Sequence, residues 1–135
     1  MEQKIFILTM EGGGTRGILQ AKFLQLLEEK MGSSVCNLFD FFTGVSIGGI
    51  HALILALLEG SASDLCNLYT KKNLHKIFSK SAWITFPMIF SPKYDGKGKT
   101  SFLYSIFGER ILSSASKNVL VSSYDFINLS LIHIS

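Results

Sequence analysis

The sequence of 135 residues has little charge, few cysteines and few prolines. Charged residues make up 17% of the chain and apolar residues 47%, a balance typical of a globular domain with its own core and not of a disordered chain. The net charge of +3 is small, and the basic residues form neither a stripe nor a zinc-finger pattern. The composition therefore gives no indication of nucleic-acid binding, and we expect no nucleic-acid partner.

The two cysteines, Cys36 and Cys66, lie far apart and outside any Cys-x-x-Cys motif, which favours reduced thiols over a disulfide or a metal site. The longest apolar stretch, residues 47–58, is shorter than the roughly 18 to 20 residues that a membrane span needs. The N-terminus has an early acid and too short an apolar run for a signal peptide. We therefore expect a cytoplasmic protein, and the sequence leaves peripheral contact with membranes open.

The order of the expected elements indicates an α/β fold. Strands are expected at residues 4–10, 37–44 and 118–126, and helices at residues 18–30, 46–60, 63–80 and 100–110. Strand, turn and helix follow one another twice, which favours a parallel sheet covered by helices. On the first helix, apolar residues recur at helical spacing and are expected to face the core: Leu19, Phe23, Leu26 and Leu27.

Three helix ends carry capping signals. Gly32 follows the first helix as a plausible C-cap. Ser61 with Asp64 resembles a capping box that opens the polar helix, and Thr100 is expected to cap the last one.

A glycine turn follows the first expected strand. In "EGGGTRG", Gly12, Gly14 and Gly17 fit G-x-G-x-x-G, and Gly13 makes three glycines in a row beside a helix N-terminus. Free backbone N–H groups at such a turn attract a negative charge. That charge could be a dinucleotide pyrophosphate, with Asp40 placed as a ribose-binding acid, or the oxyanion of an acyl-transfer intermediate.

A second glycine turn favours acyl transfer. In "TGVSIGG", Gly44, Ser46 and Gly48 fit G-x-S-x-G between a strand and a helix, with Gly49 following. This pattern is typical of a nucleophile elbow, which projects a serine oxygen above a sheet. A dinucleotide site gives no reason for this turn, whereas a hydrolase needs both the nucleophile and an anion site. The alternative role for Ser46 is that of a helix N-cap.

Together, "EGGGTRG" and "FDFFTGVSIGG" resemble the motifs of the patatin-like phospholipase family, with Glu11 in place of the more usual Asp. "SPKYDGKG" and "VLVSSYDF" also resemble segments of that family. The resemblance covers residues 4–126 and implies a three-layer α/β/α fold with a mainly parallel central sheet. It implies lipid acyl hydrolysis by a Ser-Asp dyad without metal or cofactor, acting on phospholipid or another acyl lipid.

On this resemblance Ser46 is the nucleophile, and the backbone amides of Gly12, Gly13 and Gly14 form the oxyanion hole. The residues that support the two motifs are Arg16, Gly17, Gly44, Gly48 and Gly49. Arg16 is interpreted as a helix-surface or structural residue, with contact to a lipid phosphate as the alternative.

The aspartate of the dyad is the part that the sequence does not supply. The family carries it in a D-G-G or D-G-A motif well beyond the elbow, whereas the only Asp-Gly pair here, at Asp95, comes too early, and Asp125 is followed by Phe126. We therefore interpret residues 4–126 as the N-terminal portion of the domain and residues 127–135 as an atypical tail, truncated or altered. The chain is accordingly expected to be a fragment.

The remaining titratable residues are interpreted as structural. His51 is expected to be a packed core residue, His75 a solvated one, and Asp40 a structural carboxylate. His133 lies in the tail, where a triad with Asp95 or Asp125 is a weak alternative. Residues 80–94 mix aromatic and basic side chains, which fits either a membrane interface or a packed loop.

Two other functions remain open from the sequence. One is a patatin-like fragment or pseudoenzyme that binds membranes or a partner without catalysis. The other is a dinucleotide-binding domain. The sequence does not indicate the oligomeric state.

Overall fold

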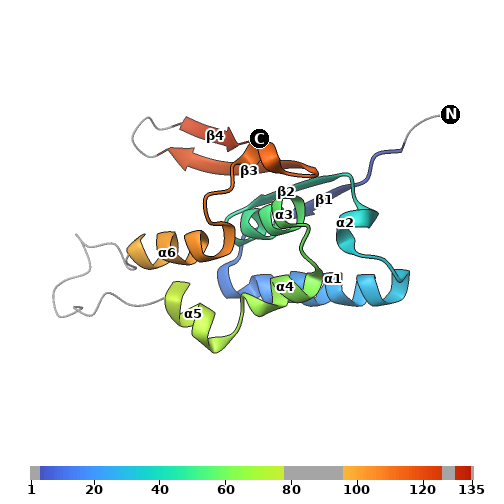
Figure 1. The fold of residues 1–135 in the computed structure, drawn as a ribbon, viewed down its shortest axis with the longest axis horizontal. Coiled ribbons are helices and arrows are strands. Elements are labelled where there is room, and N and C mark those ends of the chain that lie inside the picture. Colours follow the sequence, from blue (N-terminus) through green and yellow to red (C-terminus); the bar gives the residue numbers. More distant parts are fainter. Residues whose placement is uncertain (1–3, 78–95, 126–129, 135) are drawn as a thin grey trace. The chain divides into compact units, whose positions relative to one another are not determined.

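In a computed structural model of the chain, a four-stranded sheet forms the centre of the fold (Figure 1). The structure describes residues 4–77, 96–125 and 130–134. The strands lie side by side in chain order: β1 (Ile7–Met10), β2 (Phe41–Val45), β3 (Asn118–Asp125) and β4 (Ser130–Ile134). The first three are parallel, and β4 pairs antiparallel with β3. The α/β class and the mainly parallel sheet expected from the sequence are confirmed.

The register of the sheet aligns the carboxyl ends of its parallel strands. Met10 of β1 lies beside Gly44 of β2, and Gly44 lies beside Val121 of β3. Met10 and Phe42 are buried, whereas Ile7 and Val45 are more than half exposed. This alternation is the period of two expected along a strand. The parallel register places the turns after β1 and β2 at the same edge of the sheet.

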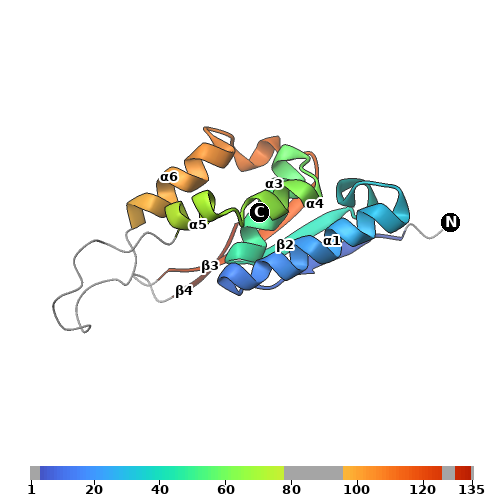
Figure 2. The same ribbon diagram turned by 90° about the horizontal axis from the view of Figure 1, so that it is seen from below.

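The helix α3 (Ile47–Leu58) covers one face of the sheet and forms a central part of the core. It packs against β2, β3 and β1, and it lies along the strands in both views (Figures 1 and 2). In the described part of the chain it supplies five of the sixteen buried apolar residues, the largest share of any one element. Most of its residues are buried, as its continuous apolar sequence predicts. No helix in the described part of the chain is long and apolar enough to cross a bilayer.

The helix α1 (Gly17–Met31) follows the short 3-10 helix η1 (Gly14–Arg16). It ends at Gly32, which adopts a left-handed conformation with φ 63°, and the Gly32 N–H donates to the carbonyl of Glu28 over 2.9 Å. The prediction of Gly32 as the C-cap is confirmed, because only glycine takes this conformation without a steric cost.

The face that α1 turns inward differs from the prediction. Ala21 and Leu24 are buried, whereas Leu19 and Phe23 are 70% and 65% exposed and Leu26 is 59% exposed. The expectation that these three apolar side chains face the core is therefore wrong. Periodicity reveals that a helix has an apolar face, but it does not say which part of the protein covers that face.

Glu28 joins three segments around the end of α1. Its carboxylate accepts from the backbone N–H of Val35, at 2.9 Å, and from that of Ala62, at 3.2 Å. Val35 begins the short helix α2 (Val35–Leu38), and Ala62 begins α4 (Ala62–Asn67). The carboxylate thus supplies acceptors to the unpaired first amides of two helices.

Replacing Glu28 with alanine is expected to lower the free energy of unfolding by about 2 kcal/mol, because two helix N-termini lose a charged acceptor. Urea unfolding followed by circular dichroism measures this. Glu29→Ala is the matched control, since Glu29 is the exposed neighbour and should change stability by less than about 0.5 kcal/mol. Equal effects of the two substitutions would contradict the assignment.

Residues 67–109 form a separate compact unit. Within it α5 (Lys71–Ile77) packs on α6 (Gly96–Phe107), and the Tyr104 hydroxyl lies 3.2 Å from a Glu109 carboxylate oxygen. The predicted helix over residues 63–80 is divided, since α4 ends at Asn67 and α5 begins at Lys71. Thr100 lies inside α6, so its prediction as a cap is wrong.

The capping box at the start of α4 is confirmed. The Ser61 backbone N–H donates to Asp64 Oδ2 over 2.8 Å, and the Asp64 backbone N–H donates to Ser61 Oγ over 3.3 Å. The remaining short element, η2 (Leu112–Ser114), leads into β3.

Candidate active site

Ser46 occupies an unusual turn between β2 and α3. Its backbone has φ 55° and ψ −122°, and its side chain is exposed. Among the described non-glycine residues only Ser46 and Glu59 have positive φ, and Glu59 sits in the ordinary left-handed conformation that closes α3. A non-glycine residue held in a sparsely populated region costs on the order of 1 to 3 kcal/mol and persists only where surrounding structure enforces it.

Two glycines enforce this turn by close approach of backbone to backbone. A Cβ added to Gly44 would overlap the backbone of Gly48 and lie 2.7 Å from the amide nitrogen of Gly49. A Cβ added to Gly48 would overlap the Met10 carbonyl oxygen and lie 2.7 Å from that of Glu11. Strand β2, helix α3 and the end of β1 therefore meet at distances that side chains would prevent.

Gly49 completes the packing of α3. A Cβ there would lie 2.8 Å from Cγ1 of Val121, on the neighbouring strand β3. The absence of a side chain at Gly49 lets the first turn of the helix approach the sheet.

The first glycine turn lies after β1 and leads into α1. Gly12 and Gly13 precede η1, Gly14 has φ 57°, and Gly17 is the buried first residue of α1. Arg16 is exposed, and its Nε lies 3.7 Å from the position that a Cβ on Gly13 would take. The turn therefore presents backbone at the start of a helix, where amides have no partner within the helix.

The structure brings the two turns together. A Cβ added to Gly12 would lie 3.1 Å from the Val45 carbonyl oxygen and 3.2 Å from Cβ of Ser46. The parallel pairing of β1 with β2 produces this contact, because both strands end at the same edge of the sheet. A serine side chain and a helix-start glycine turn are thus neighbours, which is the arrangement that an acyl-transfer site requires.

Comparison with known proteins agrees with this geometry. The family model for patatin-like phospholipase matches residues 8–132. The chain is 31% identical over 143 residues to "Patatin-like protein 2" of Oryza sativa subsp. indica, covering 93% of this chain and 35% of that protein. It is 30% identical over 138 residues to "Patatin-B1" of Solanum tuberosum, covering 93% and 34% respectively.

The chain belongs to the patatin-like phospholipase family. It spans about a third of the length of these curated relatives. The family match extends to residue 132, and the predicted division between a domain at residues 4–126 and a tail at 127–135 stays a prediction.

Asp40 of this patatin-like chain lies at the opposite end of β2 from Ser46. Its carboxylate accepts from the backbone N–H of Phe6 over 2.9 Å, and its own N–H donates to the Phe6 carbonyl over 2.8 Å. Five strand residues lie between it and Ser46, so six steps at the rise of a strand separate the two, about 20 Å. Asp40 therefore ties the entry of β2 to that of β1 and is too far away to act on Ser46 directly.

Of the other candidate bases, the structure describes the side chain of His51 alone. His51 is fully buried in α3, where burial lowers its pKa to about 4, so it is neutral near pH 7. Asp125 ends β3, His75 lies in α5 and His133 in β4, and the side chains of these three fall outside the described part. Asp95 and the aromatic and basic segment at residues 80–94 also lie outside the described residues. Among the residues that are described, no group of three metal-ligating side chains occurs.

Two hydrogen-bonding roles were not anticipated from the sequence. Gln20 on α1 donates from Nε2 to the carbonyl of Glu11 over 2.9 Å, and so holds the first residue of the glycine motif. The Cys36 thiol donates to the carbonyls of Leu55 and Gly60, each at 3.1 Å, and burial raises its pKa. Both cysteines are free thiols, as expected.

Proposed function

We propose that this chain carries the nucleophile and oxyanion hole of a lipid acyl hydrolase of the phospholipase A type, with Ser46 as the nucleophile. The observation that carries the proposal is the contact between the two glycine turns, with Gly12 packed against the strained backbone of Ser46. Family membership supports the substrate class, an acyl lipid. A protein acting on such a substrate is expected to meet membrane surfaces, and we place it at their cytoplasmic side.

The reaction we propose passes through an acyl-serine. The Ser46 oxygen attacks the ester carbonyl carbon while its proton passes to a base, and the carbonyl oxygen becomes an oxyanion. The backbone amides of Gly12, Gly13 and Gly14 donate to that oxyanion, each lost donor costing about 3 kcal/mol of barrier. The intermediate collapses with release of the alcohol, and water then cleaves the acyl-serine bond.

The base in this proposal is an aspartate of the patatin-like dyad, which we do not assign to a residue of this chain. The buried, neutral His51 is not proposed for this step. The proposal therefore divides the site: nucleophile and anion-binding turn lie within these residues, and proton transfer depends on a further carboxylate.

A fluorophosphonate probe tests the assignment. Phosphonylation requires a reactive serine beside an anion-binding site, and it does not depend on turnover of an ester substrate. We expect Ser46 to be labelled at least about tenfold faster than other exposed serines. Ser46→Ala should abolish this labelling, while Ser113→Ala, at another exposed serine, should leave it unchanged. Peptide mass spectrometry identifies the labelled residue.

Two alternatives make different predictions. A patatin-like pseudoenzyme predicts that Ser46 is labelled no faster than Ser113 even in a chain that includes the dyad aspartate, an outcome that would refute the proposed role of Ser46. A dinucleotide-binding domain predicts binding of a nicotinamide cofactor that does not depend on Ser46, and the family match gives that alternative no support.

A further inference from the structure

An apolar surface runs along the open edge of the sheet and the outer side of α1. β1 is an edge strand, so one of its sides has no neighbouring strand in the described sheet. The apolar side chains on this surface are each more than half exposed, and they are Ile5, Phe6, Ile7, Leu19, Phe23, Leu26 and Met31. We call this set the β1–α1 surface. Scattered apolar residues are normal on a protein surface, but a contiguous group of this size indicates an interaction site.

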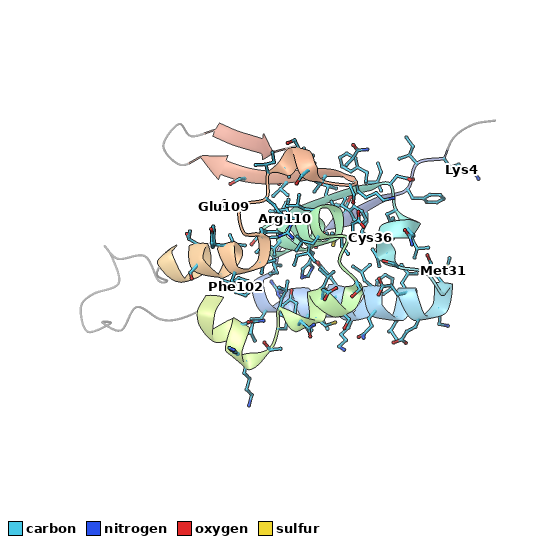
Figure 3. The ribbon with its side chains drawn as sticks, viewed as in Figure 1. Lys4, Met31, Cys36, Phe102, Glu109 and Arg110 are labelled. Atoms are coloured by element: carbon cyan, nitrogen blue, oxygen red, sulfur yellow. The ribbon has the colours of Figure 1, made fainter. Side chains whose placement is uncertain are left out.

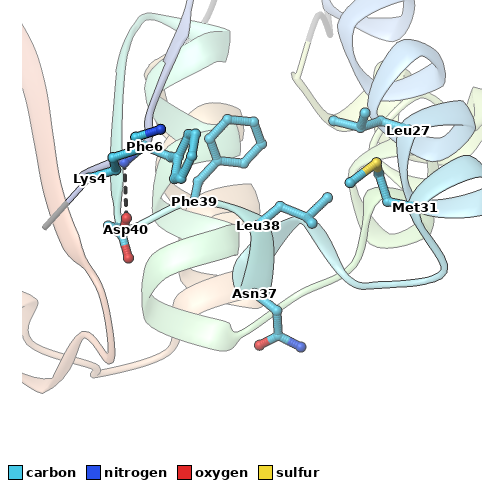
Figure 4. Close-up of a pocket in the computed structure, with 8 residues that line it drawn as sticks. All are labelled: Lys4, Phe6, Leu27, Met31, Asn37, Leu38, Phe39 and Asp40. Carbon is cyan, nitrogen blue, oxygen red and sulfur yellow. Dashed lines mark hydrogen bonds between the residues drawn. The ribbon is translucent and has the colours of Figure 1, made fainter. Parts of the chain in front are cut away.

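Two hollows lie along α1, one beside β1 and one beside the residues that precede β1. One, of about 480 Å³, is lined by Leu8 of β1 together with Leu19 and Phe23 of α1. The other, of about 530 Å³, is lined by Phe6, Leu27 and Met31 (Figure 4). Figure 3 shows Lys4 and Met31 at the same end of the molecule, where this second hollow lies. Leu8 and α1 therefore contribute to one face, whereas Ile7 points to the other face of the sheet beside the same open edge.

We propose that the β1–α1 surface binds a second copy of this chain across a two-fold axis. An edge strand can pair with its own copy in antiparallel orientation, because its free N–H and C=O groups are self-complementary about such an axis. The two copies of β1 would then join their sheets, and the exposed stripe of each α1 would pack against the other copy.

Area and charge both favour this occupant. If each side chain of the set buries on the order of 100 Å² of accessible area, the surface buries about 700 Å². A standard interface buries roughly 800 Å² per partner. Lys4 precedes β1 and Glu11 follows it, and both are exposed. Antiparallel pairing brings the Lys4 end of one copy toward the Glu11 end of the other, so that opposite charges meet at both ends of the interface.

Light scattering coupled to size-exclusion chromatography tests the proposal on the 135-residue chain. We expect a dimer of twice 14.9 kDa that dissociates on dilution. Leu19→Glu and Phe23→Glu, both at well-exposed positions where a charge should not disturb folding, are each expected to raise the dissociation constant at least about 100-fold. Circular dichroism verifies that both variants fold.

Ile111→Glu is the matched control, because Ile111 is equally exposed but lies outside the β1–α1 surface. It should leave the dimer intact. A monomeric wild-type chain, or a dimer that survives Phe23→Glu, would overturn the proposal. So would a monomer that sediments with phosphatidylcholine vesicles through Phe23, since the surface would then serve lipid.

Discussion

Gly48→Ala is expected to prevent the chain from reaching its folded state. The methyl group would overlap the carbonyl oxygen of Met10, and it would lie 2.6 Å from the Met10 carbonyl carbon and 2.7 Å from the Glu11 carbonyl oxygen. All three are backbone atoms of the strand β1 and the residue after it, so no change of rotamer relieves the clash. We expect a loss of more than about 4 kcal/mol, which is most of the stability of a small domain.

Urea unfolding followed by circular dichroism measures this loss, and Gly32→Ala serves as the control. Gly32 has φ 63°, so alanine there is strained, but no atom lies within 4 Å of the added Cβ. That substitution should cost only about 1 kcal/mol. The comparison separates the cost of a steric clash with neighbouring backbone from the cost of an unfavourable φ. A similarly small loss of stability for Gly48→Ala would show that β1 and α3 do not approach each other as closely as in the structure.

The local chemistry of the turns could be predicted from the sequence, because each turn is encoded by glycines at fixed spacing. Gly44, Ser46 and Gly48 predicted a strand-to-helix elbow, and the structure places Ser46 between β2 and α3. The contact of Gly12 with Ser46 depends on the pairing of β1 with β2, which no local pattern encodes. It could be inferred only through the parallel sheet expected from the order of elements.

The surroundings of the helices were less predictable, because burial depends on what packs against a segment. Leu19 and Phe23 have the spacing of a core face, yet Ala21 and Leu24 are the buried residues of α1. The start of the second strand was misplaced for a different reason. Ser34 accepts from the backbone N–H of Cys36 over 3.3 Å and begins α2, so the strand starts only at Phe41.

The division of the predicted helix at residues 63–80 had a signal that could have been used. Thr70 precedes α5, and the backbone N–H of Asn73 lies 3.4 Å from the Thr70 hydroxyl oxygen. A threonine three residues before a polar residue is a typical helix start, and it competes with continuation of the preceding helix.

Acidification is expected to destabilise the fold through His51. The imidazole is fully buried, and burial lowers its pKa from 6.5 to about 4. The unfolded chain therefore binds a proton between pH 6.5 and 4 that the folded chain does not, so stability is retained above pH 6.5 and lost as the pH falls toward 4. At 1.36 kcal/mol per pKa unit, the loss from this one residue approaches about 3 kcal/mol.

Urea unfolding at pH 7 and pH 4.5, for the wild type and for His51→Gln, isolates this contribution. Glutamine has no proton to bind in this range, so its variant should lose about 2.5 kcal/mol less than the wild type between the two pH values. The carboxylates titrate in both proteins and cancel in the difference. If His51→Gln does not fold, the imidazole chemical shifts of the wild type give the same answer, and an apparent pKa of 6 or above would contradict the prediction.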